Sequence, residues 1–157
     1  GNPNDKTGQR IIIDEKDEYI VTIKSEVSSF DRKALTVYET HIQDLTSSET
    51  WSQNPKYKRY AKTFKGACLE GTVYEENGSV VSTGFDHIKE LGVNAVQLLP
   101  IFDHANDEIN QSYNWGYNPL NYNSLDGAYS TDPFDGYCRI FEFKIIFWTF
   151  FWAASGI

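Results

Sequence analysis

Cysteine is scarce in this 157-residue chain, which has only Cys68 and Cys138. Two cysteines so far apart form neither a disulfide framework nor a recognisable metal-ligand spacing, so we expect two isolated thiols. The three histidines, His41, His87 and His104, also lack the spacing of a metal site. The sequence therefore indicates no cofactor or metal. We expect His41 to be packed and hydrogen-bonded within a strand, and His87 to be exposed on a helix.

Positive charge is also in short supply. The chain has 14 lysines and arginines against 22 acidic residues, which gives a net charge of −8 and a pI near 4.8. This balance argues against a nucleic acid or an anionic membrane surface as a partner. It is compatible with a neutral ligand. The sequence also lacks a phosphate-binding loop and the Gly-x-Ser-x-Gly form of a nucleophile elbow.

Long apolar runs and a secretory signal are missing as well. Residues 1–6 show no basic-then-apolar pattern, and they read as the interior of a longer protein, which leaves its localisation open. The longest apolar run, 145–154, is too short to span a membrane, which needs about 20 apolar residues. It has no polar face, so we expect it to be foreign to the surrounding fold, through a changed reading frame or a truncation. The alternative is a fully buried helix end.

Aromatic residues, by contrast, are abundant, and segment 113–119 concentrates them. It reads Tyr-Asn-Trp-Gly-Tyr-Asn-Pro. The proline disfavours helical geometry before it, and the glycine frees the backbone between two large rings. Rings on an irregular loop with amides between them suit a ligand with apolar faces and hydroxyl edges, such as a sugar. The alternative is a tightly packed aromatic loop.

The central part of the chain has the pattern of a strand, a helix and a second strand. Residues 36–42 are β-branched and aromatic, and residues 94–99 form an apolar run before a proline. Between them, Thr83 is placed to cap a helix and Gly92 to end it. Its apolar face would be made by Phe85, Ile88 and Leu91. The order predicts a βαβ unit and an α/β fold.

The remaining segments give weaker signals. Residues 1–33 are polar with one alternating stretch, and we expect short strands or an extended linker. Residues 47–77 are polar with turn signals at 54–55 and 77–78, and the stretch is long for a loop, which predicts an elaborated connection. Residues 139–147 are expected to form the next crossover helix.

The segments 37–44, 92–103, 113–119, 121–123 and 127–133, in this order, closely resemble type I pullulanases. These are α-1,6-debranching glycoside hydrolases of the α-amylase superfamily. The resemblance runs from about Val37 to Lys144 and implies an incomplete (β/α)8 TIM barrel, because a complete one needs about 250 residues. It implies that residues 34–157 are the N-terminal fragment of that barrel. Residues 1–33 would be a linker or the end of a preceding β-sandwich domain.

The resemblance implies a parent enzyme that hydrolyses α-1,6 branch points in pullulan, glycogen or starch, with the α-glucan as its partner. It allows a structural calcium in the intact family, although no residue of this sequence indicates one. Three alternatives stay open. The chain could be a non-catalytic glucan-binding protein, a fragment of a related isoamylase or branching enzyme, or an interaction module that docks through its aromatic tail.

Glycosidases use two carboxyl groups about 5–9 Å apart across the scissile bond. Acidic side chains in loops usually face water, and we expect this of the carboxylates here. In the superfamily the catalytic carboxylates lie on later barrel strands, so the resemblance assigns no catalytic residue and implies that the chain as given is inactive. The candidates considered are Glu39, Asp44, Asp103, Asp107, Glu108, Asp126 and Asp132.

What the resemblance does imply is substrate binding. In the superfamily, the tyrosine of a Gly-Tyr pair after this strand stacks on a glucose ring, and Tyr117 matches it. Tyr113, Asn114 and Trp115 would shape the same wall. The alternative for Trp115 is that it packs beneath the loop. Asn118 stands where the family usually has an aspartate, so a charge is lost there.

Overall fold

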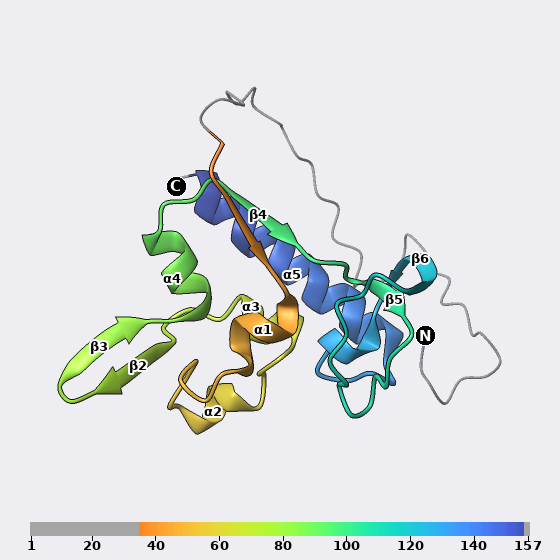
Figure 1. The fold of residues 1–157 in the computed structure, drawn as a ribbon, viewed down its shortest axis with the longest axis horizontal. Helices are drawn as coiled ribbons and strands as arrows, with labels where there is room; N and C mark the ends of the chain where they lie inside the picture. The colour runs from red at the N-terminus through yellow and green to blue at the C-terminus, as the bar shows by residue number, and fades with distance from the viewer. Residues whose placement is uncertain (1–34, 156–157) are drawn as a thin grey trace.

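The structure is a computed structural model that describes residues 35–155, with side chains up to residue 150 (Figure 1). The linker or β-sandwich end predicted for residues 1–33 lies outside the described residues. Among residues 35–155 the strands form three two-stranded sheets.

The first sheet confirms the predicted βαβ unit. Strand β1 (Val37–Thr40) pairs in parallel with β4 (Ala95–Leu98), from Val37 opposite Ala95 to Thr40 opposite Leu98. Helix α4 (Gly84–Glu90) lies on the connection between them. Because parallel neighbours need a crossover connection, this arrangement makes the described part a mixed α/β structure. The α/β class read from the sequence is therefore confirmed.

Strand β1 is shorter than the predicted 36–42, because His41 begins a helix instead of extending the strand. Helix α1 (Ile42–Ser47) starts directly after it, and the His41 imidazole Nδ1 accepts a hydrogen bond from the Gln43 backbone N–H at 3.2 Å. This bond satisfies one of the free N–H groups at the helix start. The placement of His41 in a strand was wrong, and its packed, hydrogen-bonded state is confirmed.

The elaborated connection predicted over residues 47–77 is confirmed, and it consists of short elements that the sequence did not indicate. Helices α2 (Pro55–Lys58) and α3 (Phe64–Ala67) are followed by an antiparallel hairpin of β2 (Val73–Glu76) and β3 (Ser79–Ser82). The two turn signals are confirmed. Asn54 caps α2, and the hairpin turns at residues 77–78 with φ values of 52° and 80°. The hairpin projects away from the body (Figure 1).

Helix α4 agrees with its predicted start and end. Thr83 occupies the N-cap position, although its hydroxyl donates to the Trp51 carbonyl instead of capping the helix. Phe85 and Ile88 are buried, whereas Leu91 is 50% exposed. Gly92 follows the helix with a φ of +67°, the left-handed geometry expected of a glycine at a helix end.

The last helix corrects the reading of the apolar tail. Helix α5 (Gly136–Ser155) is longer than the predicted 139–147 and runs through the apolar segment. Ile146 is 1% exposed, and the Phe150 ring packs edge-on against Phe85 with centroids 5.0 Å apart. Ile146 and Phe150 therefore pack within the fold, whereas Phe147 is 42% exposed. No helix among residues 35–155 has the length and apolarity to cross a membrane.

The core joins four elements beneath the ends of β1 and β4. It consists of Ile42, Phe64, Ala67, Tyr129 and Ile146, from α1, α3, the short 3-10 helix η2 (Gly127–Tyr129) and α5. Strands β5 (Phe102–His104) and β6 (Pro119–Leu125) pair beside this core in an antiparallel, irregular register. Their connection, 105–118, carries the aromatic segment.

Core packing by α5 can be tested by truncating one buried side chain. We expect Ile146→Ala to reduce the free energy of unfolding by about 2–5 kcal/mol, because it leaves a cavity among buried side chains. Leu91→Ala, at the half-exposed leucine that directly follows α4, should cost less than about 1 kcal/mol. Urea unfolding followed by circular dichroism measures both. Equal costs would mean that α5 does not pack as described.

Candidate binding site at the strand ends

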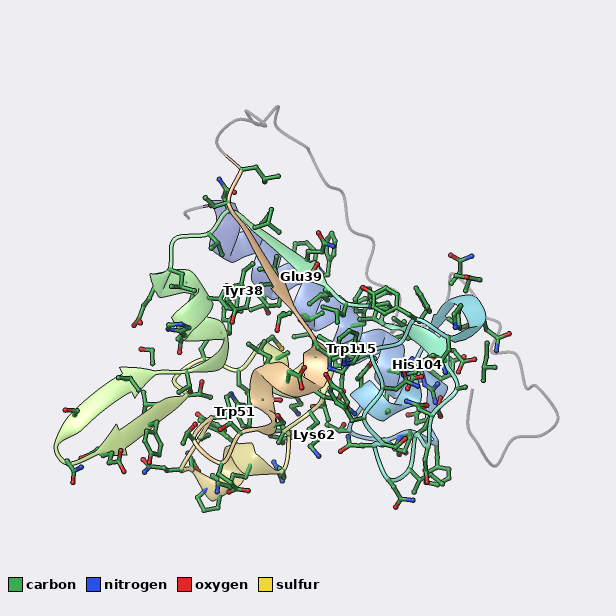
Figure 2. The ribbon with its side chains drawn as sticks, viewed as in Figure 1. Tyr38, Glu39, Trp51, Lys62, His104 and Trp115 are labelled. Atoms are coloured by element: carbon green, nitrogen blue, oxygen red, sulfur yellow. The ribbon has the colours of Figure 1, made fainter. Side chains whose placement is uncertain are left out.

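The aromatic segment lies at the carboxyl end of β4. Gly116 has a φ of +86° and sits directly against Pro100, so that a Cβ at Gly116 would come within 2.8 Å of the Pro100 Cβ and carbonyl oxygen. No other residue adopts this backbone so readily and leaves room for the proline. The loop is therefore closely fitted to the chain that leaves β4. Figure 2 shows Trp115 next to the place where β1 ends and α1 begins.

A buried imidazole ties this loop to the end of β1. The His41 side chain is 3% exposed, and its Nε2 lies 3.0 Å from the Asn114 carbonyl oxygen and 3.1 Å from the Tyr129 hydroxyl. Because Nδ1 already accepts from Gln43, the neutral ring carries its proton on Nε2 and donates it to Asn114. Burial lowers the pKa of His41, and the bond to Asn114 opposes this effect.

Asn114 is occupied in shaping the loop. Its Oδ1 accepts a hydrogen bond from the Gly116 N–H at 2.9 Å, and its Nδ2 donates to the Ala105 carbonyl at 3.0 Å. Both ends of the amide thus hold backbone groups. The Asn118 amide also donates to Ala105, at 3.4 Å. An amide at position 118 supplies this donor, which the aspartate usual in the resembling family could not.

The three rings of the segment project from the loop. Tyr113, Trp115 and Tyr117 are 55%, 62% and 68% exposed. The tightly packed aromatic loop and the packing of Trp115 beneath it were therefore not found. Two contacts orient Tyr113. Its hydroxyl donates to Asp44 Oδ2 at 2.8 Å, and its ring centroid lies 5.1 Å from that of His41. Three exposed rings within five residues make this loop the candidate binding site of the described part.

Three of the seven candidate carboxylates are buried, which corrects the expectation that they face water. Asp103, Glu108 and Asp126 are each 0–1% exposed. Each of the three accepts at least one hydrogen bond from a neighbouring backbone or side-chain donor, so none is buried as an isolated charge. Sequence reasoning missed this role, and the only available signal was that Asp126 precedes a Gly-Ala-Tyr turn.

Asp126 and Glu108 together fix the turn beneath the loop. Asp126 accepts from the Ala128 N–H at 2.8 Å and from the His104 N–H at 3.1 Å. Glu108 Oε1 accepts from the Gly127 N–H at 3.1 Å and from Arg139 Nη1 at 3.4 Å. Burial raises the pKa of Glu108, whereas the guanidinium of Arg139 lowers it. This network holds η2, and with it Tyr129, against His41.

The same carboxylates have the spacing of a cation site, since ligand oxygens of Asp103, Glu108 and Asp126 lie within 4.8 Å of one another. However, backbone N–H groups and the Arg139 guanidinium already supply positive charge to this cluster. The arrangement is accounted for as a structural network, and we assign no metal to it.

The two cysteines are free thiols, as predicted. Burial raises the pKa of Cys68 to about 11 and also raises that of Cys138. Both thiols are protonated near neutral pH, so neither has the thiolate character of a nucleophile. His87 is exposed on α4, also as predicted.

Comparisons with known proteins agree with the motif resemblance, although no family model matches the chain. It is 38% identical over 111 residues to a pullulanase of Bacillus subtilis (strain 168), covering 69% of this chain and 14% of that protein. A chloroplastic isoamylase of Zea mays is 29% identical over 121 residues, covering 73% of this chain and 13% of that protein.

Structural comparison gives the same result. The crystal structure of an Anoxybacillus sp. LM18-11 pullulanase complexed with maltotriose matches with a TM-score of 0.74 and 33% identity. The match covers 87% of this chain and 19% of that protein. The chain therefore belongs to the pullulanases, as its motifs predicted, and it spans a small part of the length of the proteins it matches.

The buried His41 should make folding stability depend on pH. Its folded pKa lies below the 6.5 of an unperturbed histidine, so the fold binds fewer protons than the unfolded chain. The contribution is complete above a pH of about 6.5 and is lost as the pH falls below that value, because the protonated ring is a charge held away from water.

We expect the urea midpoint of the wild-type chain to fall between pH ~6.5 and ~5, and to fall less in His41→Gln, which cannot take up this proton. Other titrating groups are common to both proteins and cancel in the difference. An NMR titration that gave His41 a pKa at or above 6.5 would contradict the assignment.

Proposed function

We propose that this chain, a segment of a pullulanase-like debranching glycoside hydrolase, supplies one wall of the site that binds an α-glucan at its α-1,6 branch. The observation that carries the proposal is the exposed aromatic surface of Tyr113, Trp115 and Tyr117 at the carboxyl end of a parallel strand pair. In (β/α)8 barrels, this is the end at which substrates bind.

The barrel itself is part of the proposal. The described part contains one βαβ unit, β1–α4–β4, whereas a (β/α)8 barrel needs eight strands and eight helices. Residues 34–157 would be the N-terminal fragment of such a barrel. The small share of each pullulanase that the chain covers, 14% and 19%, supports this reading.

Tyr117 is the residue proposed to stack on the substrate. It is the most exposed of the three rings, and the loop around it is fixed by the bonds of Asn114 and His41. A rigid, exposed ring buries the C–H face of a pyranose at little entropic cost. Trp115 extends the same surface. Tyr113, held by Asp44, forms its edge, and Asn114 contributes by setting the loop shape.

The proposed substrate is an α-1,6-branched glucan such as pullulan, glycogen or starch. The pullulanase of Anoxybacillus, whose structure holds maltotriose, has its matching segment in the same fold. A glucan is neutral and polyhydroxylated, which suits an aromatic wall on a chain of net charge −8.

Hydrolysis itself is proposed to need carboxylates from outside this segment. Asp103, Glu108 and Asp126 are buried and held by protein donors, and Glu39 accepts a hydrogen bond from Gln97 at 3.1 Å on the neighbouring strand. Three of these four are buried and all four are engaged with protein donors, whereas a glycosidase acid and nucleophile must both reach the scissile bond.

Substrate stacking can be tested in a graft. Residues 35–150 of this chain would replace the matching segment of the Bacillus subtilis pullulanase, and hydrolysis of pullulan would be followed as kcat/KM. We expect Tyr117→Ala to lower kcat/KM at least tenfold, an order-of-magnitude figure from aromatic contact and positioning. Tyr117→Phe should cost less, because it keeps the ring.

The control for this graft is Tyr74→Ala, which removes a tyrosine on the projecting hairpin. We expect it to leave kcat/KM within about twofold, since surface changes away from a site have small effects. Equal effects of Tyr117→Ala and Tyr74→Ala would show that the substrate wall is misplaced. If the graft without any point substitution were inactive, this would contradict the proposal that residues 35–150 are equivalent to the matching segment of the pullulanase.

The 157-residue chain by itself should not hydrolyse pullulan or α-1,6-linked oligosaccharides, because general acid catalysis and the covalent step both need positioned carboxyl groups. Release of reducing sugar by the purified chain measures this against a buffer control. Release that exceeds the buffer and disappears on changing one of the chain's acidic residues would overturn the expectation.

A further inference from the structure

One segment of this acidic chain is strongly basic. Residues 50–69 contain five lysines and arginines and no aspartate or glutamate, although the whole chain has a net charge of −8. The segment covers α2, α3 and the turn between them. All of its cations are exposed or half-buried. They are Lys56, Lys58, Arg59, Lys62 and Lys65, and we call residues 56–65 the basic segment.

The cations of the basic segment are poorly neutralised by the chain itself. Within the described residues only Lys58 forms an ion pair, with Glu49 at 3.0 Å. Arg59 and Lys65 both approach the ring of Tyr60, at 4.5 Å and 4.4 Å from its centroid. Two like charges near one ring repel each other. An anion that contacts both would relieve this repulsion.

The backbone that carries these cations is fixed. The Tyr60 carbonyl accepts from the Thr63 hydroxyl at 2.8 Å, and Gly66 lies so close to it that a Cβ would come within 2.0 Å of that oxygen. Lys62 has a φ of 66°, and its backbone N–H donates to the buried Thr46 hydroxyl at 2.6 Å. This left-handed geometry is strained for a lysine, and such strain is concentrated at functional positions.

Helix α1 joins the basic segment to the aromatic loop. Thr46 of α1 holds the backbone of Lys62, and Asp44 of the same helix accepts from the Tyr113 hydroxyl at 2.8 Å. These two positions of α1 lie within one helical turn. In Figure 2, Lys62 and Trp115 both lie next to α1. The basic segment is therefore a neighbour of the surface proposed to bind a glucan.

The chemistry of the segment favours a ligand with isolated phosphate groups. Arginine and lysine bind phosphate through charge-assisted hydrogen bonds. A nucleic acid draws its affinity from many phosphates along an extended basic surface, which a chain with 22 acidic residues does not offer. A few cations beside a sugar-binding wall fit a polysaccharide that carries occasional phosphate esters.

We propose that the basic segment binds phosphate ester groups of an α-glucan whose sugar rings lie on the aromatic loop. Arg59 and Lys65 bind the phosphate beside Tyr60, and Lys62 extends the positive surface toward α1. The chain thereby selects phosphorylated glucan over neutral glucan. This inference deepens the proposed function and rests on it, because it takes the aromatic loop as the glucan-binding surface.

The test measures binding of the complete 157-residue chain to two forms of one amylopectin by affinity electrophoresis. One form carries phosphate monoesters, and the other has been treated with alkaline phosphatase. We expect the Kd for the phosphorylated form to be lower by about fivefold or more at low salt, from several exposed charge pairs. The preference should vanish near 0.5 M salt, roughly, because exposed charges are then screened.

Single substitutions locate the phosphate site. Arg59→Gln and Lys65→Gln should each reduce the preference by about 1.5- to fivefold, the size expected of an exposed charge pair. Lys62→Gly should also reduce it, and glycine suits the φ of 66°, so the fold is kept. Lys89→Gln is the matched control. It makes the same change in net charge, but Lys89 of α4 is already paired with two carboxylates, so the preference should stay unchanged.

Several results would overturn the inference. Equal affinity for the two forms would do so and leave the proposed function standing, whereas binding to neither form would refute the proposed function itself. Equal losses for Arg59→Gln and Lys89→Gln would reduce the preference to net charge. A preference that survives Arg59→Gln, Lys65→Gln and Lys62→Gly would place the phosphate elsewhere.

Two further outcomes would assign the basic segment to another partner. RNA that binds more tightly than phosphorylated amylopectin, and is released by the same substitutions, would make it a nucleic-acid surface. The sequence also contains an acidic stretch, Asp-Glu-Lys-Asp-Glu at 14–18. A preference for phosphate that appears only when these four acids are replaced by amides would make that stretch the occupant.

Discussion

One buried imidazole holds the candidate site together. His41 stands where β1 ends, and its two ring nitrogens reach in different directions. Nδ1 caps α1 through Gln43, while Nε2 holds the Asn114 carbonyl and contacts the Tyr129 hydroxyl. The strand, the helix, the aromatic loop and the core tyrosine therefore share one side chain. Because a neutral ring offers one donor and one acceptor, only the unprotonated form satisfies this arrangement.

A second set of buried polar groups fixes the turn that lies beneath the aromatic loop. Asp126 and Glu108 bind the backbone N–H groups of residues 127 and 128, and Arg139 connects Glu108 to the start of α5. The position of Tyr129 against His41 depends on this turn. Buried charges are costly unless paired and hydrogen-bonded, so their presence here is explained by the turn that they fix. The exposed rings can be rigid because these polar contacts lie beneath them.

Sequence alone predicted the parts of the fold that follow from local chemistry. The pairing of β1 with β4, the start and end of α4 and the turns at residues 54–55 and 77–78 all have capping, glycine or periodic signals. The short elements of 47–77 were not predicted, because a four-residue helix is too short to show a hydrophobic period. The end of β1 at Thr40 was missed since His41 serves as a cap, a role that serine or aspartate usually fills. Burial of Asp103, Glu108 and Asp126 depends on contacts between distant segments, which no local pattern encodes.

The exposed rings of the candidate site differ from an ordinary exposed apolar patch, because the polar groups of their loop are satisfied. Trp115 and Tyr117 project from a loop in which Asn114 accepts from the Gly116 N–H and donates to the Ala105 carbonyl. A ring on a loop fixed in this way loses little conformational entropy when a ligand covers it. The geometry therefore supports the proposed stacking of Tyr117 on a glucan ring, which needs an apolar face that is already in place.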